Sequence, residues 1–423
     1  MSAITLADGF TWGIAALATA GVIVRPWKLP EWISAVAGAV TLVVFGLLPV
    51  GAALTGVEKG IDVYLFLIGM MLLAELARRE GLFDWLAAQA ARLAKGSARR
   101  LFTLVYLVGT VVTIFLSNDA TAVVLTPAVA SVARAVQARE KLPYLFICAF
   151  IANAAGFVLP ISNPANLVIY GTHMPPLLEW LARYAPSALL SILATYVALR
   201  LTQRRALRQK ILASVEVPAL SAAGKAAACG IIATAVVLTA ASALDIQLGL
   251  ATFTAGFVTA AFVLLRKREA PWGVLRGISW GVLPLVAGLF VLVESLDTTG
   301  VLGVLSAALH DAARESVGRT AWGVGIVLAL ACDVMNNLPV GLIAGHAVQV
   351  AGVPNAVSGA VVIGVDLGSN LSVTGSLATI LWLTALRRDG QDVSAWTFLK
   401  LGIVVMPPAL LLALGALLLR HSA

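Results

Sequence analysis

Long apolar segments, separated by short polar or basic loops, make up almost the whole chain. An α-helix needs about 20 apolar residues to cross a hydrocarbon core of roughly 30 Å. Uninterrupted spans are expected over residues 11–24, 32–50, 61–77, 177–199, 226–244, 248–265, 274–296 and 397–419. Two further stretches, 81–95 and 301–313, mix apolar with polar residues and are typical of amphipathic helices at the membrane interface.

Two apolar segments are each interrupted by a short polar stretch, which predicts re-entrant hairpins. Residues 117–121 (Ser-Asn-Asp-Ala-Thr) separate an apolar run from a second run of 12 residues, 122–133. As a helix this second run is about 18 Å long, which is short for a full span. Residues 321–350 repeat the pattern with a break at 336–339 (Asn-Asn-Leu-Pro). The sequence leaves a count of twelve complete spans open as the alternative.

Two other apolar segments carry prolines and hydrogen-bonding residues at mid-length. Residues 144–170 are interrupted at 160–166, and residues 356–386 are interrupted at 368–376. Proline removes a backbone donor, and polar side chains at membrane depth need partners, so both segments are expected to be discontinuous helices. With them, the prediction is ten spans plus two hairpins.

Composition supports this picture, because 60% of the 423 residues are hydrophobic and only 12% are charged. Soluble domains carry about 25% charged residues. The net charge of +8 does not point to nucleic acid, since the basic residues sit in short loops. Loops on one side hold 24 of the 29 Lys and Arg residues, so that side is expected to be cytoplasmic, facing the anionic lipid bilayer, with both termini outside. The first apolar segment lacks signal-peptide features and is expected to be a retained helix.

The chain offers little for enzymatic or metal chemistry. Cys148, Cys229 and Cys332 form no Cys-x-x-Cys pair, and the four histidines form no His-Glu-x-x-His motif. We therefore expect no metal, no cofactor and no enzymatic activity.

The two halves of the chain can be aligned, which predicts an inverted repeat. At an offset of 219 residues, Gly69, Glu75, Gly81 and Asn118 match Gly288, Glu294, Gly300 and Asn337; at an offset of 213, Asn153, Asn163 and Asn166 fall on Asp366, Ser376 and Thr379. Five spans in each half would invert the second copy, as in many secondary transporters. The expected units are an N-terminal repeat (1–200), a cytoplasmic linker loop (201–225) and a C-terminal inverted repeat (226–423).

Three motifs resemble the ArsB-type arsenite efflux permeases of the ion-transporter superfamily. Residues 115–127 (FLSNDATAVVLTP) resemble the hallmark of that family, residues 336–340 its second hairpin, and residues 366–382 its second broken helix. The resemblance runs from about residue 30 to the C-terminus. At 369–370 the chain has Ser-Asn where well-known members have Pro-Lys. The resemblance implies a bacterial inner-membrane protein that exports arsenite or antimonite, driven by protons or by a partner ATPase subunit. No Walker A motif occurs, so the chain by itself is not expected to hydrolyse ATP.

Arsenite near neutral pH is mostly As(OH)3, whose three hydroxyls both donate and accept hydrogen bonds. Amide and hydroxyl side chains and free backbone groups at helix breaks can match them. The expected substrate residues are Asn118, Asn153, Asn163, Asn166, Asn336, Asn337, Gly375, Ser376 and Thr379. The scattered cysteines argue against a thiolate trap, although a direct role of Cys332, four residues before Asn336, stays open.

Proton coupling requires a carboxyl group near the site, because burial raises the pKa of a carboxyl group into a usable range. The candidates are Asp119, Asp366 and Asp333. Asp119 could instead cap the returning helix of the first hairpin. Glu75 and Glu294 lie near span ends, where a structural role is the simpler interpretation.

Several other functions remain to be weighed. A sodium/proton antiporter of the same superfamily is the nearest alternative, since the hairpin amides could coordinate sodium. A dicarboxylate carrier is disfavoured because the proposed site contains no arginine. An intramembrane enzyme lacks its motif, and a channel fits broken helices less well than alternating access does. Rocking and elevator motions are both open.

Overall fold

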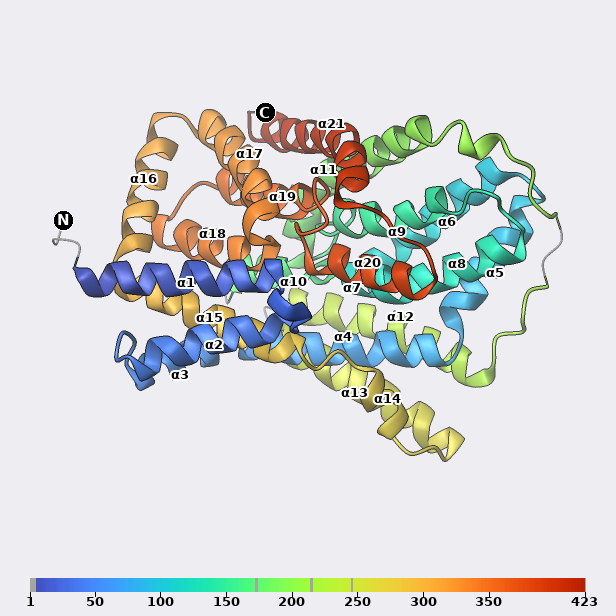
Figure 1. Ribbon diagram of the computed structural model, residues 1–423, viewed down its shortest axis with the longest axis horizontal. Helices are drawn as coiled ribbons and strands as arrows, with labels where there is room; N and C mark the ends of the chain where they lie inside the picture. The colour runs from blue at the N-terminus through green and yellow to red at the C-terminus, as the bar shows by residue number, and fades with distance from the viewer. Residues whose placement is uncertain (1–4, 172–173, 214–215, 245, 423) are drawn as a thin grey trace.

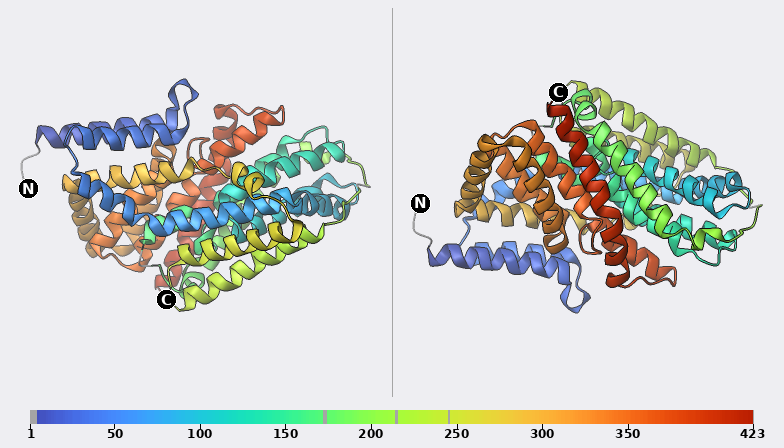
Figure 2. Two further views of the ribbon diagram at one scale, coloured as in Figure 1. Left: turned by 90° about the horizontal axis from the view of Figure 1, so that it is seen from below. Right: turned by 90° about the horizontal axis from the view of Figure 1, so that it is seen from above.

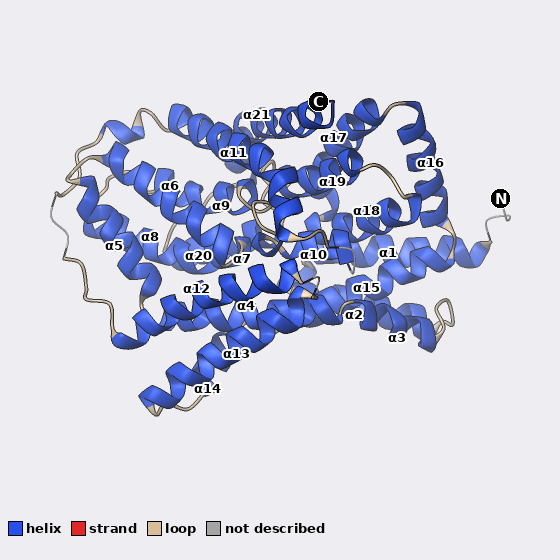
Figure 3. Ribbon diagram, turned by 180° about the vertical axis from the view of Figure 1, so that it is seen from behind, coloured by secondary structure: helices blue, strands red, loops and turns tan. Residues whose placement is uncertain are grey.

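The computed structural model describes residues 5–171, 174–213, 216–244 and 246–422. In these ranges it is helical, with no strand and with one isolated antiparallel β-bridge between Ser97 and Lys210 (Figure 3). The first half contains α1 (Leu6–Val24), α2 (Glu31–Val44), α3 (Val50–Lys59), α4 (Ile61–Arg79), α5 (Leu82–Ala94), α6 (Ala98–Phe115), α7 (Asn118–Ala120), α8 (Thr126–Ala135), α9 (Leu142–Ala154), α10 (Pro164–Tyr170) and α11 (Leu177–Thr202). The second half contains α12 (Ala222–Ala243), α13 (Leu248–Lys267), α14 (Trp272–Gly277), α15 (Val282–Thr298), α16 (Val301–Glu315), α17 (Val317–Met335), α18 (Asn337–Ala351), α19 (Asn355–Gly368), α20 (Leu377–Arg388) and α21 (Ala395–Ser422). A π-helical stretch, Thr121–Leu125, joins α7 to α8.

Seven of the described helices are long and apolar enough to cross a membrane: α1, α6, α11, α12, α13, α17 and α21. The bent pairs α3–α4 (45°) and α15–α16 (77°) bring the number to nine. The prediction of an all-α polytopic membrane protein is therefore confirmed. The amphipathic segments expected at 81–95 and 301–313 form α5 and α16.

Two expected spans are shorter or broken in the structure. The segment 32–50 ends as a helix at Val44, because Gly46 turns the chain with a positive φ of 69° before α3 begins. The segment 274–296 is interrupted where Ile278 is extended, and α15 starts only at Val282. The length of the apolar segments alone does not predict either of these interruptions.

The polar breaks of both predicted hairpins and both helix breaks occur where the polar residues predicted them. The first arms of the hairpins, α6 and α17, are each long enough to cross a membrane, so the choice between re-entrant hairpins and complete spans stays a prediction. The first hairpin pairs α6 with the helical stretch 118–135, and the hydroxyls of Thr113 and Thr121 join its arms at 2.8 Å. The second hairpin pairs α17 with α18 across Asn336, whose φ is 69°. The breaks separate α9 from α10 and α19 from α20.

The helices form two bodies, which we call the panel and the core. The panel contains α1–α4 and α12–α15, and it lies along the lower part of Figure 1; the core contains α5–α11 and α16–α21 (Figures 1 and 2). Within the panel, α4 packs on α13 and α15 packs on α2 and α3, so the two halves of the chain interlock. At Gly69 a β-carbon would collide with the backbone of Thr252, so this glycine allows the close contact of α4 with α13.

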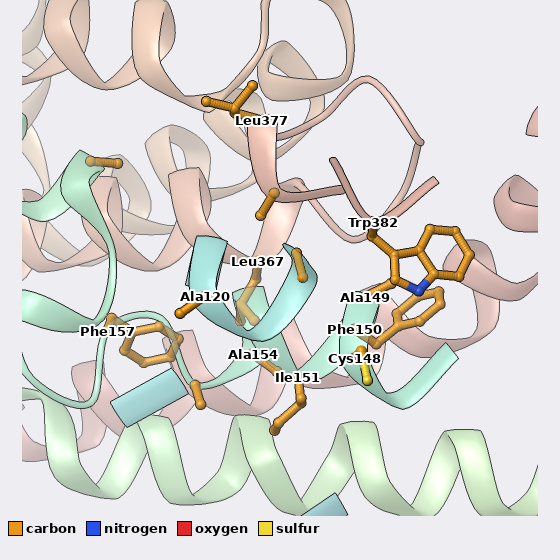
Figure 4. Packing of buried hydrophobic residues seen from close by; sticks show 14 of the residues in the cluster. Ala120, Cys148, Ala149, Phe150, Ile151, Ala154, Phe157, Leu367, Leu377 and Trp382 are labelled. Atoms are coloured by element: carbon orange, nitrogen blue, oxygen red, sulfur yellow. The ribbon is translucent and has the colours of Figure 1, made fainter. Parts of the chain in front are cut away.

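The core is packed around α9, α19 and α20. Phe150 stacks on Phe398 with ring centroids 4.9 Å apart, and the indole N–H of Trp382 donates to the carbonyl of Leu145 at 2.9 Å. Figure 4 shows the rings of Phe150 and Trp382 close together, with Cys148 and Ala149 beside them. The breaks are therefore held by a dense apolar shell.

Helix starts in the two halves correspond at the predicted offsets. The starts of α5, α6 and α7 match those of α16, α17 and α18 at 219 residues, and those of α9 and α10 match α19 and α20 at 213. This correspondence is compatible with the inverted repeat, which stays a prediction together with its boundaries at residues 200 and 225. The linker 201–225 is tied to the core in part, since Gln209 accepts the backbone N–H of Arg139 at 2.7 Å and Leu212 N–H donates to Val136 at 2.9 Å. Residues 214–215 of that linker lie outside the described residues.

Candidate substrate site where hairpin tips and helix breaks meet

The two hairpin tips and the two helix breaks converge on one small cleft inside the protein. Its lining residues are Leu67, Asn118, Asp119, Asn163, Pro164, Val282, Val286, Asn337, Leu338, Leu377 and Ala378. The cleft has a volume of about 10 Å³, which is room for about one water molecule. The core supplies the polar wall, and α4 and α15 of the panel supply the apolar wall.

Four helical segments begin at this cleft: the stretch 118–135, α10, α18 and α20. Their first turns are capped by side chains, which explains why the chain starts helices here. The hydroxyl of Ser376 accepts the N–H of Thr379 at 3.1 Å, and the side-chain oxygen of Asn336 accepts the N–H of Leu338 at 3.3 Å. Helix N-termini carry partial positive charge, so the cleft favours oxygen atoms with lone pairs over bare cations.

Two of the predicted amides are oriented by the backbone. The side-chain oxygen of Asn118 accepts the N–H of Asp119 at 2.8 Å, and that of Asn163 accepts the N–H of Ala165 at 3.0 Å. Asn163 also donates to a carboxylate oxygen of Asp366. With both amide oxygens engaged, these side chains offer N–H donors to the cleft.

Acceptors come from the other side of the cleft. The backbone N–H of Asn337 donates to Gly375 at 2.9 Å, while its side-chain oxygen is buried and has no hydrogen-bond partner among the described residues. Asp119 adds a carboxylate. The cleft thus combines amide donors with two acceptors, which suits a small ligand whose groups do both.

Other predicted substrate residues are close by but belong to the supporting framework. Asn153 donates to Asn370 at 3.0 Å, Asn370 donates to the carbonyl of Phe150 at 3.0 Å, and the hydroxyls of Ser376 and Thr379 lie 2.9 Å apart. These side chains are buried and join the two broken helices, and they do not line the cleft.

Asn166, Asn336 and Gly375 have the same role. Asn166 donates to the carbonyl of Gly156 at 2.8 Å, and Asn336 donates to that of Thr374 at 3.1 Å. Each bond holds a loop next to a helix start. The predicted set therefore separates into cleft residues (Asn118, Asn163, Asn337) and framework residues.

The three candidate aspartates occupy different places. Asp119 lines the cleft and also a larger cavity beside it. Asp366 is fully buried behind Asn163. Asp333 lies on the last turn of α17, where its backbone carbonyl accepts the hydroxyl of Thr374 at 3.2 Å, and it does not line the cleft. Of the three, only Asp119 lines the cleft.

The two glutamates form ion pairs away from the cleft. Glu75 binds Arg78 at 2.6 Å, and Glu294 binds Lys59 at 2.6 Å. These pairs fit a structural role. Cys332 is buried and its thiol donates to the carbonyl of Val365 at 3.5 Å, so it does not line the cleft either.

Sequence reasoning missed two parts of the site. Asn370 connects the two broken helices, and its position in the polar break at 368–376 was the available signal. Leu67, Val282 and Val286 form the panel wall, and nothing distinguishes them from other apolar residues along a span.

A cavity of about 540 Å³, which we call the vestibule, adjoins the cleft and shares Leu67, Asp119, Pro164 and Val282 with it. Its outer lining includes Arg78, Arg276 and Arg388. These arginines lie at the end of the molecule that carries most of the Lys and Arg residues of the loops, which we call the basic end. It is at the right of Figure 1, where α5 lies. The cleft is therefore reached from the basic end in this conformation. No group of three or more His, Cys, Asp or Glu side chains suited to a metal occurs among the residues described.

Comparison with known proteins shows which family and which relatives this chain is similar to. The citrate transporter family (CitMHS) matches residues 17–365. Two arsenical pump membrane proteins of Escherichia coli are each 29% identical to the chain, one over 367 residues (84% of this chain, 85% of the relative) and one over 413 residues (95% and 96%). An uncharacterized transporter of Mycobacterium tuberculosis is 25% identical over 417 residues (95% and 96%).

Solved structures share the fold at low sequence identity. The YdaH transporter of Alcanivorax borkumensis is 14% identical with a TM-score of 0.59, covering 88% of this chain and 87% of its own. MtrF of Neisseria gonorrhoeae is 13% identical with a TM-score of 0.54, covering 90% and 84%. The apolar helices and bacterial relatives together indicate a multi-pass protein of the bacterial inner membrane. The similarity to the arsenical pump membrane proteins supports an ArsB-type permease, and the chain belongs to the citrate transporter family (CitMHS).

Proposed function

We propose that the protein exports arsenite and antimonite from the cytoplasm in exchange for protons, by alternating access of the cleft to the two sides of the membrane. The names of the E. coli relatives, arsenical pump membrane proteins, support the substrate class. The basic end of the molecule is taken as cytoplasmic on the charge rule. The vestibule then opens the cleft to the cytoplasm, from which the cargo is loaded.

One observation carries the substrate assignment, namely the pairing of donors and acceptors in the cleft. Asn118 and Asn163 offer amide N–H groups, while Asn337 and Asp119 offer oxygens. As(OH)3 and Sb(OH)3 are small and neutral, and each hydroxyl both donates and accepts. No thiolate takes part, so cargo held by hydrogen bonds can also be released. Because the cleft holds about one water molecule in this conformation, binding requires the panel wall to move back.

Asp119 is the proposed proton carrier, since it lines the cleft and is reached from the vestibule. A carboxylate accepts a hydroxyl of the cargo, whereas a protonated carboxyl group does not offer that oxygen in the same way. Proton and cargo would then compete for one group, which is the requirement for exchange. Asp366 acts indirectly, by orienting Asn163. Reconstitution of the protein into proteoliposomes without other subunits tests the alternative that a cytoplasmic ATPase subunit adds to the driving force.

A sodium/proton antiporter remains the second candidate, favoured by the carboxylate of Asp119 and the unpartnered oxygen of Asn337. The four helix starts at the cleft oppose a bare cation. A carrier of di- or tricarboxylates, as the family name suggests, would need cationic groups at the cargo. The arginines lie instead at the outer part of the vestibule, not in the cleft.

The deciding experiment measures arsenite uptake into everted membrane vesicles energised by respiration, with and without a protonophore. Uptake that depends on this protein and collapses with the protonophore is the expected result. Uptake that persists with the protonophore would contradict proton exchange. Sodium-driven proton movement without arsenite uptake would transfer the same residues to a cation site.

A further inference from the structure

A histidine on the second hairpin contacts an aspartate on the panel. The imidazole Nε2 of His346 on α18 lies 3.1 Å from a carboxylate oxygen of Asp297 on α15. Both side chains are partly exposed, 25% and 37% respectively, so solvent protons can reach them.

This contact joins the two bodies of the protein. Across the ranges that the structure describes, it is the one hydrogen bond or ion pair between a panel side chain and a core helix; the other polar contacts stay within the panel, within the core, or at the connections between successive helices. Lys59–Glu294, Trp12–Thr299 and Asp62–Gly249, for example, are all internal to the panel. Movement of the core against the panel would therefore break the His346–Asp297 contact and leave most other polar contacts intact.

The contact lies at the end of the molecule opposite the vestibule. α15 starts at Val282, which lines the vestibule, and Asp297 is 15 residues further, about 22 Å along the helix. The neighbouring Thr299 accepts the indole N–H of Trp12 near the chain start, at the left of Figure 1. The pair thus closes the panel onto the core on the outer side while the cleft is open on the basic side.

Other charged groups on the helices around α18 do not contact His346 among the described residues. Those groups are Glu294 on α15, His310, Asp311, Arg314 and Glu315 on α16, Arg319 and Asp333 on α17, and Asp366 on α19. Glu294 is held by Lys59, and His310 binds the carbonyl of Ala351, which belongs to the core like His310 itself. Asp297 is therefore the counter-charge that protonation of His346 would engage.

We propose that His346 is a proton-binding site on the outer side, and that its protonation favours the conformation in which the cleft opens to the basic side. A protonated imidazole gains an ion pair with Asp297 in this conformation and loses it when panel and core separate. By linkage, acid on the outer side then shifts the protein toward this conformation. In the proposed exchange, on which the transport role of this site rests, an outer proton would return the empty carrier to the side where cargo is loaded.

The test follows conformation and needs no arsenite. Val123 lines the vestibule, so a V123C substitution in a C229S background reports opening through its reaction rate with an impermeant maleimide. Everted vesicles expose the vestibule to the medium, held at constant pH, and enclose the outer side. The enclosed solution is set to about pH 5.5 or about pH 8, because histidine is the side chain that generally changes charge in this range.

We expect labelling about 2- to 5-fold faster with acid inside, which is the size of effect that a partly exposed ion pair supports. H346Q and D297N should abolish the difference. H346K, which keeps the charge at both pH values, should label fast at both. H310Q is the matched control and should respond like the parent.

A pH response that survives in H346Q, or is lost in H310Q, would overturn the proposal. The outcome is separate from that of the transport assay. Failure of arsenite uptake with an intact labelling response would reject the cargo and keep the proton site. Normal arsenite uptake without any labelling response to pH would support the cargo and reject the proton site.

Discussion

Asn163 donates a side-chain hydrogen bond to Asp366, and this bond connects the break of the first discontinuous helix to the helix that precedes the second break. Both side chains are buried, but only Asn163 lines the cleft. Because the oxygen of Asn163 also accepts the N–H of Ala165, its amide has one orientation. The fully buried carboxylate thus determines which group a ligand meets at Asn163.

Removing that carboxylate should weaken cargo binding rather than change the driving force. For Asp366→Ala we expect a lower apparent affinity for arsenite, with kcat/KM reduced about 10-fold or more, because leaving the buried amide of Asn163 without its acceptor costs about 1–3 kcal/mol. Initial rates in everted vesicles over a range of arsenite concentrations measure this. The remaining uptake should still collapse with a protonophore. An unchanged KM would show that Asn163 needs no support from Asp366.

Asp119→Asn should abolish the coupling of transport to protons while arsenite binding remains. The amide keeps the size of the side chain and its hydrogen bonding but cannot carry a proton. Respiration-driven accumulation of arsenite should be lost, while exchange of labelled for unlabelled arsenite across the membrane continues. Asp333→Asn is the matched control, since Asp333 does not line the cleft, and it should accumulate arsenite normally. Proton-driven accumulation in Asp119→Asn would exclude Asp119 as the carrier.

The cleft should discriminate by hydroxyl count. Monomethylarsonous acid has two hydroxyls in place of three, so one of the cleft groups, such as the unpartnered oxygen of Asn337, would stay unsatisfied. Leaving a buried polar group unpaired costs about 1–3 kcal/mol, and transport should favour arsenite by about 10-fold or more. Competition assays measure this ratio. Asn337→Ala should reduce the preference for arsenite over monomethylarsonous acid. If Asn337→Ala keeps the full ratio, the third hydroxyl binds a different group.

Cys332→Ser should transport arsenite at close to the normal rate. The thiol is buried, bonds the carbonyl of Val365 and does not line the cleft, and a serine hydroxyl can make the same bond. Uptake rate and arsenite KM are the measurements. A large loss of affinity, with normal amounts of folded protein, would reveal a direct sulfur–arsenic contact in another conformation.

Gly69→Val should destabilise the panel. A β-carbon at Gly69 would collide with the backbone of Thr252, and backbone cannot rotate away. Overpacking of this kind costs about 1–3 kcal/mol, so the thermal unfolding midpoint in detergent should fall. Gly13→Val is the control, because its β-carbon would meet no atom within 4 Å. Equal midpoints for the two variants would mean that α4 and α13 can separate without cost.

Local pattern was sufficient for much of the fold. The apolar segments predicted the helices, and polar residues at 117–121 and 336–339 marked both hairpin tips, because membrane helices must satisfy their backbone internally and polar side chains at that depth are costly. The caps at Ser376 and Asn336 are also local, since each side chain bonds a backbone group two or three residues away. The turn at Gly46 was missed because glycine is common in apolar segments.

Tertiary structure decided which polar residues line the cleft and which support it. Asn163 and Asn166 stand three residues apart in the same break, yet one lines the cleft and the other binds the carbonyl of Gly156. Composition and spacing do not separate them, because the partner that engages each amide comes from the surrounding packing. The panel wall at Leu67 and the His346–Asp297 contact likewise join residues far apart in the chain. The sequence by itself determined where helices form and where they break; the packing of panel against core decided which polar atoms remain free to bind a ligand.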